Sequence, residues 1–131
     1  MLYTTNDTDA YKLSKSNLSN PSFDLRIKSS ITIKPYENRL ISTGIRVKIP
    51  KNEIGMVLGK NATNREGILV FNTIYDSSYS GYIGIQCMNL TDEIINLPSG
   101  HPLAQLIFFD LGKDTNTIPK EIPLKDFTQL F

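Results

Sequence analysis

The sequence predicts an all-β fold, a sandwich or barrel built from short strands. Three observations support this prediction. Apolar and charged residues alternate with a period of two, as in the stretch IRVKIP at residues 45–50. Turn-forming clusters separate such stretches at intervals of roughly eight to twelve residues. No segment carries a sustained apolar stripe of helical period.

The expected strands follow one another along the middle of the chain. Ile31 and Ile33 alternate with polar residues in ITIKP, and Ile83 and Ile85 do so in YIGIQC. The apolar run PLAQLIFF at residues 102–109 is typical of a core strand. The best helix candidate is short and lies near Thr63–Glu66. The turn clusters between these segments are KPYENR, IPKNEIG, NATNREG, DSSYSG, NLTDE and LPSGHP.

The two ends of the chain differ in composition from the middle. Residues 1–20 are polar and rich in Asn, Ser and Thr, which predicts a mobile N-terminal arm. Residues 112–131 contain two prolines and several charges, which predicts an extended C-terminal tail. The β domain itself is therefore expected to span residues 21–111.

Composition limits the compartment and the partners. Cys87 is the single cysteine, so the chain can form no internal disulfide, which suits a reducing compartment. The first residues lack the features of a secretory signal, and no apolar run approaches bilayer length. With 14 basic and 13 acidic side chains, the net charge of +1 provides no sustained positive field for nucleic acid. We expect a cytoplasmic or nuclear protein that binds neither membranes nor nucleic acid.

Residue counts also exclude several kinds of chemistry. One histidine and one cysteine cannot build a His/Cys zinc site from this chain alone. A Ser-His-Asp triad would have to use His101, which lies in the turn PSGHPL and is interpreted as a turn histidine. The stretch GKNAT lacks the glycine spacing of a phosphate-binding P-loop.

Four segments, in their order and spacing, resemble the first four motifs of the dUTPase family. They are PSFDLRIKSSITIKPYENRLISTGIRVKIP, GMVLGKNATNREGILV, IYDSSYSGYIGIQCMN and GHPLAQLIFF. The resemblance covers residues 21–109. It implies a jelly-roll or distorted β-barrel that assembles as a homotrimer, with nucleotide sites shared between neighbouring chains. It also implies hydrolysis of dUTP to dUMP and pyrophosphate, with one Mg²⁺ on the triphosphate.

The resemblance assigns roles to particular residues. Asp76 matches the aspartate that orients and deprotonates the attacking water, and Tyr79 matches the tyrosine that lies against the deoxyribose and excludes a 2′-hydroxyl. Gly81 lets the chain turn closely. Asp24 matches the acidic position associated with the metal and its waters. Lys60 and Gln105 match phosphate-contacting positions.

Departures from the family pattern predict weak binding and slow turnover. Asn61 and Ala62 stand where the family has hydroxyl donors to the phosphates. Phe71, Asn72 and Thr73 replace small residues whose backbone approaches the uracil, which would narrow the pocket at Asn72. The tail offers a phenylalanine in KDFTQLF, but it contains no arginine and no glycine after residue 112 to form the closing fifth motif.

Three functions therefore remain open. The first is a dUTPase of low activity, which the matches at Asp24, Asp76, Tyr79 and Gln105 favour. The second is a catalytically inactive binding or scaffold protein of viral type that keeps the fold and has a protein partner at its C-terminal tail. The third is a relative of dCTP deaminase, which ranks last because no glutamate stands in the serine-arginine context that this chemistry requires.

Overall fold

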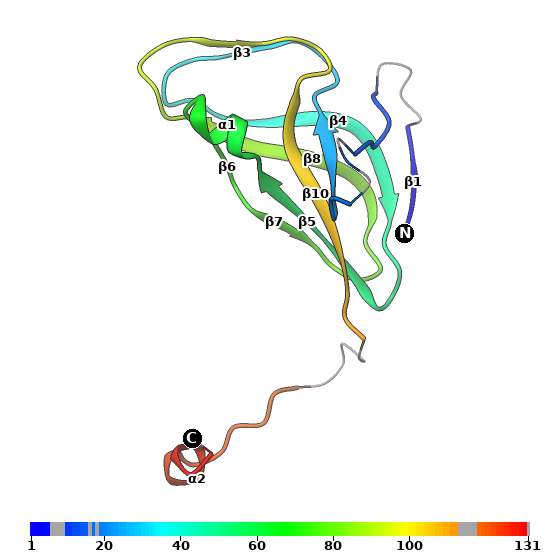
Figure 1. The fold of residues 1–131 in the computed structure, drawn as a ribbon, viewed down its shortest axis with the longest axis vertical. Helices are drawn as coiled ribbons and strands as arrows, with labels where there is room; N and C mark the ends of the chain where they lie inside the picture. Colours follow the sequence, from blue (N-terminus) through cyan, green and yellow to red (C-terminus); the bar gives the residue numbers. More distant parts are fainter. Residues whose placement is uncertain (6–9, 16, 18, 113–117, 131) are drawn as a thin grey trace.

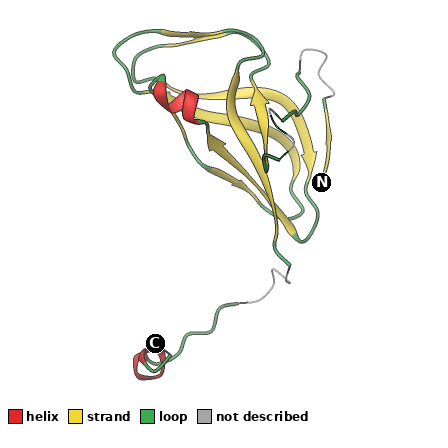
Figure 2. Cartoon of the chain, viewed as in Figure 1, coloured by secondary structure: helices red, strands yellow, loops and turns green. Residues whose placement is uncertain are grey.

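The structure, a computed structural model, describes residues 1–5, 10–15, 17, 19–112 and 118–130. Strands dominate the body of the molecule, and the described helices are short (Figures 1 and 2). The elements are β1 (Leu2–Thr4), β2 (Ser22–Arg26), β3 (Ile31–Ile33), β4 (Asn38–Lys48), β5 (Glu53–Gly59), α1 (Asn61–Arg65), β6 (Ile68–Val70), β7 (Thr73–Tyr75), β8 (Ser80–Asn89), β9 (Ile95–Leu97), β10 (Pro102–Asp110) and α2 (Leu124–Thr128).

The strands form two four-stranded sheets and one two-stranded ribbon, and every pairing is antiparallel. One sheet has the order β1-β4-β8-β6, the other has the order β2-β10-β5-β7, and β3 pairs with β9. The chain crosses repeatedly from one sheet to the other, so consecutive strands such as β4 and β5 lie in different sheets. This arrangement confirms the predicted all-β, jelly-roll fold.

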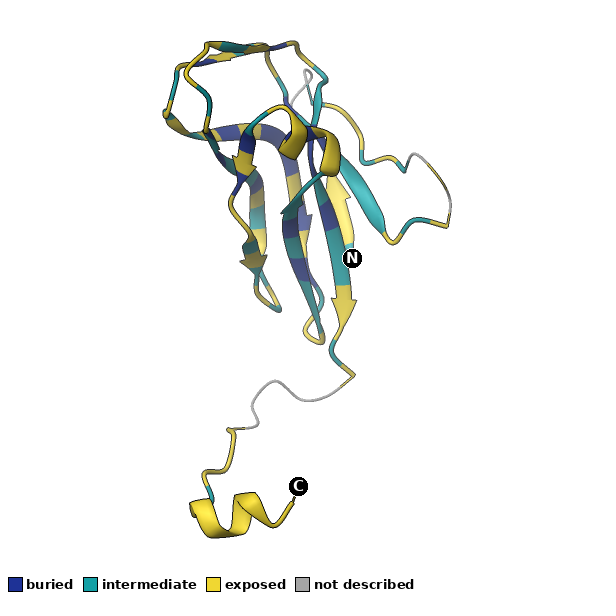
Figure 3. Ribbon diagram, turned by 60° about the vertical axis from the view of Figure 1, so that its left-hand side comes forward, coloured by how far each residue is buried: buried dark blue, intermediate teal, exposed yellow. Residues whose placement is uncertain are grey.

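The core lies between the two large sheets, where the alternating apolar residues meet. From Ile83 to Asn89, β8 buries every second residue, including Ile85 and Cys87, and the residues between them are only partly buried (Figure 3). Leu106 of β10 and Val57 of β5 face them from the second sheet and are fully buried. Burial of a side chain of this size contributes about 1.5–3 kcal/mol, so this interlayer core is the main source of stability.

A bulge interrupts the long pairing of β4 with β8. The register shifts between Ser42 and Arg46, and Gly44 adopts a φ of 71°, which a glycine reaches without strain. The hydroxyl of Thr43, which is fully buried, donates to the carbonyl of Ile83 at 2.6 Å and so replaces part of the interrupted ladder. Ser42, where the shift begins, lies opposite Gly84 of β8.

The described residues of the N-terminal segment contact the domain, and the tail contains a short helix. Residues 2–4 form β1 against β4, and the Asp24 amide donates to the carbonyl of Ser14 at 2.7 Å. The segment expected to be a mobile arm is therefore paired with the domain at these two places. The tail contains the short helix α2, which has no buried residue and lies apart from the domain in Figure 1. The domain bounds, residues 21–111, stay a prediction. Among the described residues, no helix is both long and apolar enough to cross a bilayer.

Cys87 provides a test of the packing between the sheets. Burial raises the pKa of its thiol from an ordinary value of 9.0 to about 11, although the charge of Arg39 opposes the shift. Because the thiolate is the reactive form, we expect an aromatic disulfide reagent to label Cys87 in guanidinium but not in the native protein. Because the folded state holds the thiol proton more tightly than the unfolded chain, its contribution to the free energy of unfolding should decline between about pH 9 and about pH 11.

The matched control for this measurement is Cys87→Ala, which should show no labelling and should lose that part of the alkaline decline. Equal labelling rates for native and denatured protein would contradict the buried position of Cys87.

Candidate functional site

The structure separates the predicted site residues into two groups. Asp24, Lys60 and Gln105 lie together where β2, β10 and β5 run side by side, and we call them the Asp24 group. Asp76 and Tyr79 lie in the turn between β7 and β8, with Gly81 at the start of β8, and we call these three the hairpin group. In Figure 1, α1, which follows Lys60, lies near the upper end of the β domain, and the β7–β8 turn lies toward its lower end.

The Asp24 group is assembled by strand register. Gln105 of β10 lies opposite Asp24 of β2, and its side-chain amide donates to the carbonyl of Gly59 at 2.7 Å. Lys60 follows the last residue of β5 and precedes α1, and its Nζ lies 2.5 Å from Oδ1 of Asp24. Nη2 of Arg26 lies 3.8 Å from Oδ2 of the same carboxylate. Register therefore brings together residues that are far apart in sequence.

The Asp24 group is suited to binding an anion. Its carboxylate is only 13% exposed and is matched against two cations, Lys60 and Arg26, so the local charge is positive. The ammonium of Lys60 has three donors, and the carboxylate uses one of them. The oxygens of a polyphosphate could accept hydrogen bonds from the remaining N–H groups of Lys60 at the surface.

The group does not amount to a metal site built by the protein. No cluster of three or more His, Cys, Asp or Glu side chains that could hold a metal occurs among the residues that the structure describes. Asp24 is the one carboxylate in the group, and Lys60 already contacts it. Mg²⁺ usually binds through one or two carboxylates together with substrate phosphates and water. The donor set fits a metal that arrives on a phosphate chain.

The hairpin group is held in a fixed turn. The Tyr79 amide donates to the Asp76 carbonyl at 3.0 Å, and Ser78 takes a positive φ of 69° to close the turn. The backbones of Ser78 and Tyr79 both bond to Ile49, at 3.1 and 2.9 Å, which ties the turn to the end of β4. Asp76 itself is exposed, and its carboxylate forms no ion pair with any other described residue. Its carboxylate is therefore open to solvent.

Tyr79 lies over Gly81, where a larger residue would have to displace the tyrosine ring. A Cβ at Gly81 would come within 2.7 Å of the Tyr79 hydroxyl. The hydroxyl donates to the Tyr82 carbonyl at 2.7 Å, and the ring lies 4.9 Å from the ring of Tyr75. The sequence predicted that Gly81 permits a close turn. The structure shows that it makes room for the tyrosine.

A pocket of about 340 Å³ opens beside this hairpin. Tyr75 and Tyr79 form part of its wall, and Asp76 directly follows Tyr75 in the chain. The Gly84 amide donates to the Tyr75 hydroxyl at 3.1 Å, and that hydroxyl lies 3.4 Å from the Gly84 carbonyl. Burial raises the pKa of Tyr75 above its usual value, and its contact with Tyr79 adds to the shift, although the hydrogen bond from Gly84 opposes it. The pocket is lined by Leu40, Ile41, Ser42, Tyr75, Tyr79, Tyr82, Ile83 and Gly84.

Sequence reasoning missed Tyr75 and Gly84 as part of this pocket. Phe71, Asn72 and Thr73 do not line this pocket, and their effect at the edge of the uracil stays a prediction. Asn72 is exposed between β6 and β7, and Asn61 is exposed at the start of α1. The available signal was the spacing of the tyrosines in YDSSYSGY, because a hairpin brings side chains at both ends of a turn to one cleft.

The two groups are too far apart in one chain to serve one nucleotide. Gln105 of β10 pairs with Asp24 of β2 on one side and with Leu58 of β5 on the other, so Asp24 and Leu58 lie at the same level of the sheet. Asp76 follows Tyr75, which lies opposite Gly55 of the same strand. With about 4.8 Å between strands and about 3.3 Å per residue, the Cα atoms of Asp24 and Asp76 are roughly 20 Å apart. The α-phosphorus and the metal-binding phosphates of one nucleotide are much closer than this.

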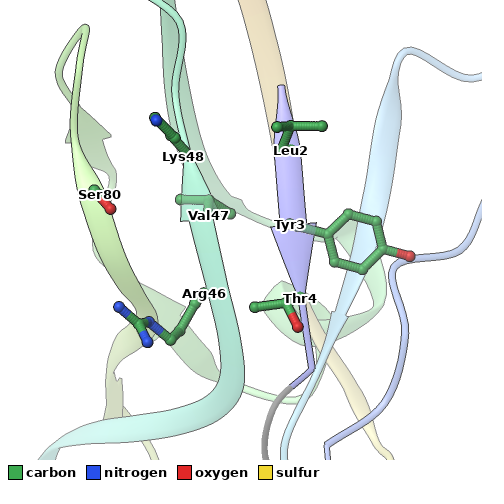
Figure 4. A pocket seen from close by; sticks show the side chains of 7 residues that line it. All are labelled: Leu2, Tyr3, Thr4, Arg46, Val47, Lys48 and Ser80. Carbon is green, nitrogen blue, oxygen red and sulfur yellow. The ribbon is translucent and has the colours of Figure 1, made fainter.

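A second pocket, of about 230 Å³, lies where β1 packs beside β4 (Figure 4). Arg46 and Lys48 project on one side of β4 near Ser80, and Leu2 and Thr4 border the pocket from β1. None of the predicted site residues lines it.

Comparison with known proteins agrees with the fold. The family model described as dUTPase matches residues 12–128 of this chain. The Pol polyprotein of equine infectious anemia virus (strain Wyoming) is 34% identical over 85 residues, which cover 65% of this chain and 7% of that protein. The deoxyuridine 5′-triphosphate nucleotidohydrolase of Clostridium novyi is 36% identical over 87 residues, which cover 64% of this chain and 61% of that protein.

Solved phage structures share the architecture at low sequence identity. A mutant dUTPase from phage phi11 of S. aureus, described with a structural Mg(II) ion, superposes with a TM-score of 0.82 at 15% identity, covering 92% of this chain and 97% of that one. A Staphylococcus bacteriophage 80alpha dUTPase with dUpNHpp gives a TM-score of 0.81 at 15% identity, covering 92% and 88% of the two chains. At this level of identity, the likeness establishes the fold.

Proposed function

This chain belongs to the dUTPase family, and from that premise we propose that it hydrolyses dUTP slowly to dUMP and pyrophosphate, at sites shared between copies in a homotrimer. The single free cysteine suits an intracellular setting for this reaction. The observation that carries the proposal is the separation of the two residue groups on one chain.

The separation is resolved if two chains contribute to each site. A cyclic trimer repeats one heterologous contact three times, so the hairpin group of each copy can meet the Asp24 group of its neighbour. Large apolar side chains are available for such a contact on the outer face of the β4–β8 sheet, where Leu40 is 69% exposed and Tyr82 is 51% exposed. Each trimer would then hold three equivalent sites.

The hairpin group supplies the base and the sugar contact. Asp76 accepts a proton from a water whose oxygen attacks the α-phosphorus, while the bond from that phosphorus to the bridging oxygen of the leaving pyrophosphate breaks. The ring of Tyr79 is fixed over Gly81 by the hydrogen bond of its hydroxyl to Tyr82. In that position it forms a wall against C2′ of the sugar, which leaves no room for a ribose hydroxyl.

The Asp24 group supplies charge for the phosphates. Lys60 would move from Asp24 toward the phosphate chain, and the carboxylate would then face the waters of a phosphate-bound Mg²⁺. The metal, when bound, neutralises charge that develops on the phosphate oxygens. Gln105 is already bonded to Gly59 and keeps the end of β5 in place beside Lys60.

Slow turnover follows from what the site lacks. Asn61 and Ala62 at the start of α1 provide no hydroxyl donor for the phosphates. The tail beyond residue 112 has no arginine, and its Phe127 lies in the exposed helix α2. Arginine contacts and lid closure each contribute orders of magnitude in phosphoryl transfer, because they stabilise charge and exclude water.

A second candidate is a nucleotide-binding protein without catalysis. It is favoured by the close contact of Lys60 with Asp24, since a carboxylate held by a lysine is less available to a metal. In that case a protein partner could bind the exposed apolar residues of the tail, among them Leu124 and Phe127.

Pyrophosphate release from dUTP with Mg²⁺ tests the proposal. We expect turnover that is at least about a hundredfold below that of the Clostridium novyi relative under the same conditions, because the hydroxyl donors and the arginine are missing. UTP should be hydrolysed far more slowly than dUTP, because the Tyr79 ring excludes the 2′-hydroxyl. No release above the uncatalysed background would favour the second candidate. Equal release from UTP and dUTP would contradict the role of Tyr79.

A further inference from the structure

The gap between β7 and β8 exposes both backbone hydrogen-bonding groups of Gly84. The N–H and C=O of one strand residue point to the same side of the strand. Beside β6, the backbone bonds to β8 extend only to Gln86, whose carbonyl accepts from the Phe71 amide at 2.9 Å, and β7 diverges to pair with β5. Within the described residues, the Gly84 groups on this side are met by a single side chain, the phenol of Tyr75.

The Tyr75 hydroxyl contacts both the amide and the carbonyl of Gly84. Its oxygen accepts from the Gly84 amide at 3.1 Å and donates toward the Gly84 carbonyl at a longer 3.4 Å. Its ring is held against Tyr79 at 4.9 Å inside the pocket wall. The donation is near the limit of a hydrogen bond, so a ligand with a better matched donor and acceptor can compete with the hydroxyl.

The edge of a uracil ring is such a ligand. It presents a ring N–H flanked by carbonyl oxygens, so the N–H can donate to the Gly84 carbonyl while an oxygen accepts from the Gly84 amide. We propose that the Tyr75 hydroxyl occupies the base-recognition groups of this hairpin, so that a pyrimidine must displace it to bind. Tyr75 is thus a residue that determines affinity for the base. The inference rests on the proposed function, because it takes deoxyuridine nucleotides as the ligands of this pocket.

Displacement lowers the apparent affinity of the nucleotide. When the binding-competent arrangement is only a fraction of the population, the measured affinity falls by that fraction. Removing the hydroxyl leaves the Gly84 groups without their internal partner, so the competing arrangement loses its hydrogen bonds. Affinity for the base should then rise, although the variant has lost a polar group from the pocket.

Calorimetric titration of dUMP and of dUpNHpp into wild type and Tyr75→Phe tests this inference. We expect Tyr75→Phe to bind both ligands about fivefold to tenfold more tightly, as the loss of one competing hydrogen bond predicts. Tyr36→Phe is the matched control, since Tyr36 is a surface tyrosine that is 60% exposed and does not line this pocket. Its affinities should equal those of wild type. Equal or weaker binding by Tyr75→Phe overturns the inference.

A second variant and a check of folding separate the effect of the Tyr75 hydroxyl from damage to the fold. Tyr75→Val removes the ring as well as the hydroxyl and should also bind more tightly, and circular dichroism verifies that each variant keeps its strands. Tighter binding by Tyr75→Phe with no hydrolysis by wild type would support the inference while refuting the proposed activity. Hydrolysis by wild type with weaker binding by Tyr75→Phe would support the proposed activity while refuting the inference. Absence of binding by every variant overturns the inference.

Discussion

Asp76→Asn is expected to lower dUTP hydrolysis by about 10²-fold to 10⁴-fold, the range typical for the loss of a general base. The amide cannot accept the proton of the attacking water, but it keeps the shape of the side chain. Because Asp76 is exposed and forms no ion pair with another described residue, the change should cost little stability. Pyrophosphate release at saturating dUTP measures the effect.

The matched control for that change is Asp92→Asn, which alters another exposed aspartate in the loop between β8 and β9. It should retain wild-type turnover. Binding of dUpNHpp to Asp76→Asn should stay within a few fold of wild type, because the pocket and Tyr79 are unchanged. If Asp76→Asn retained full turnover, Asp76 could not be the base and the hairpin group would not be catalytic.

The sequence predicted the strands well because their signal is local. Alternating isoleucines at Ile83 and Ile85 place one face of β8 in the core whatever the partner strand is. The predicted short helix near Thr63–Glu66 overlaps α1, which begins slightly earlier. Family membership, inferred from four motifs in register, is confirmed by the family model.

The details of the site were harder to predict because they depend on contacts across strands. The contact of Lys60 with Asp24 is created by the register of β2, β10 and β5, which no single segment encodes. The Tyr75 hydroxyl can bond to the backbone of Gly84 because β7 and β8 diverge into different sheets. The position of Asn72 at the edge of the base stays a prediction, and the side chain of Tyr75, three places later, is part of the pocket wall.

The shared site makes a second prediction with a large effect. Lys60→Met should abolish most activity by removing the phosphate contact, and Asp76→Asn should do so by removing the base. If each site combines the Asp24 group of one chain with the hairpin group of the next, a trimer that contains both variants regains intact sites. In an equal mixture of randomly assembled chains, about one quarter of the sites should contain both wild-type groups.

Mixing the two variants tests the central claim of a shared site most directly. The variants are refolded together in equal amounts, and pyrophosphate release from dUTP is compared with that of each variant refolded alone and of refolded wild type. The shared site predicts that the mixture recovers about a quarter of wild-type turnover, although each variant alone is nearly inactive. Turnover of the mixture no higher than the mean of the two variants would contradict it, because sites contained within one chain cannot be repaired by a neighbour.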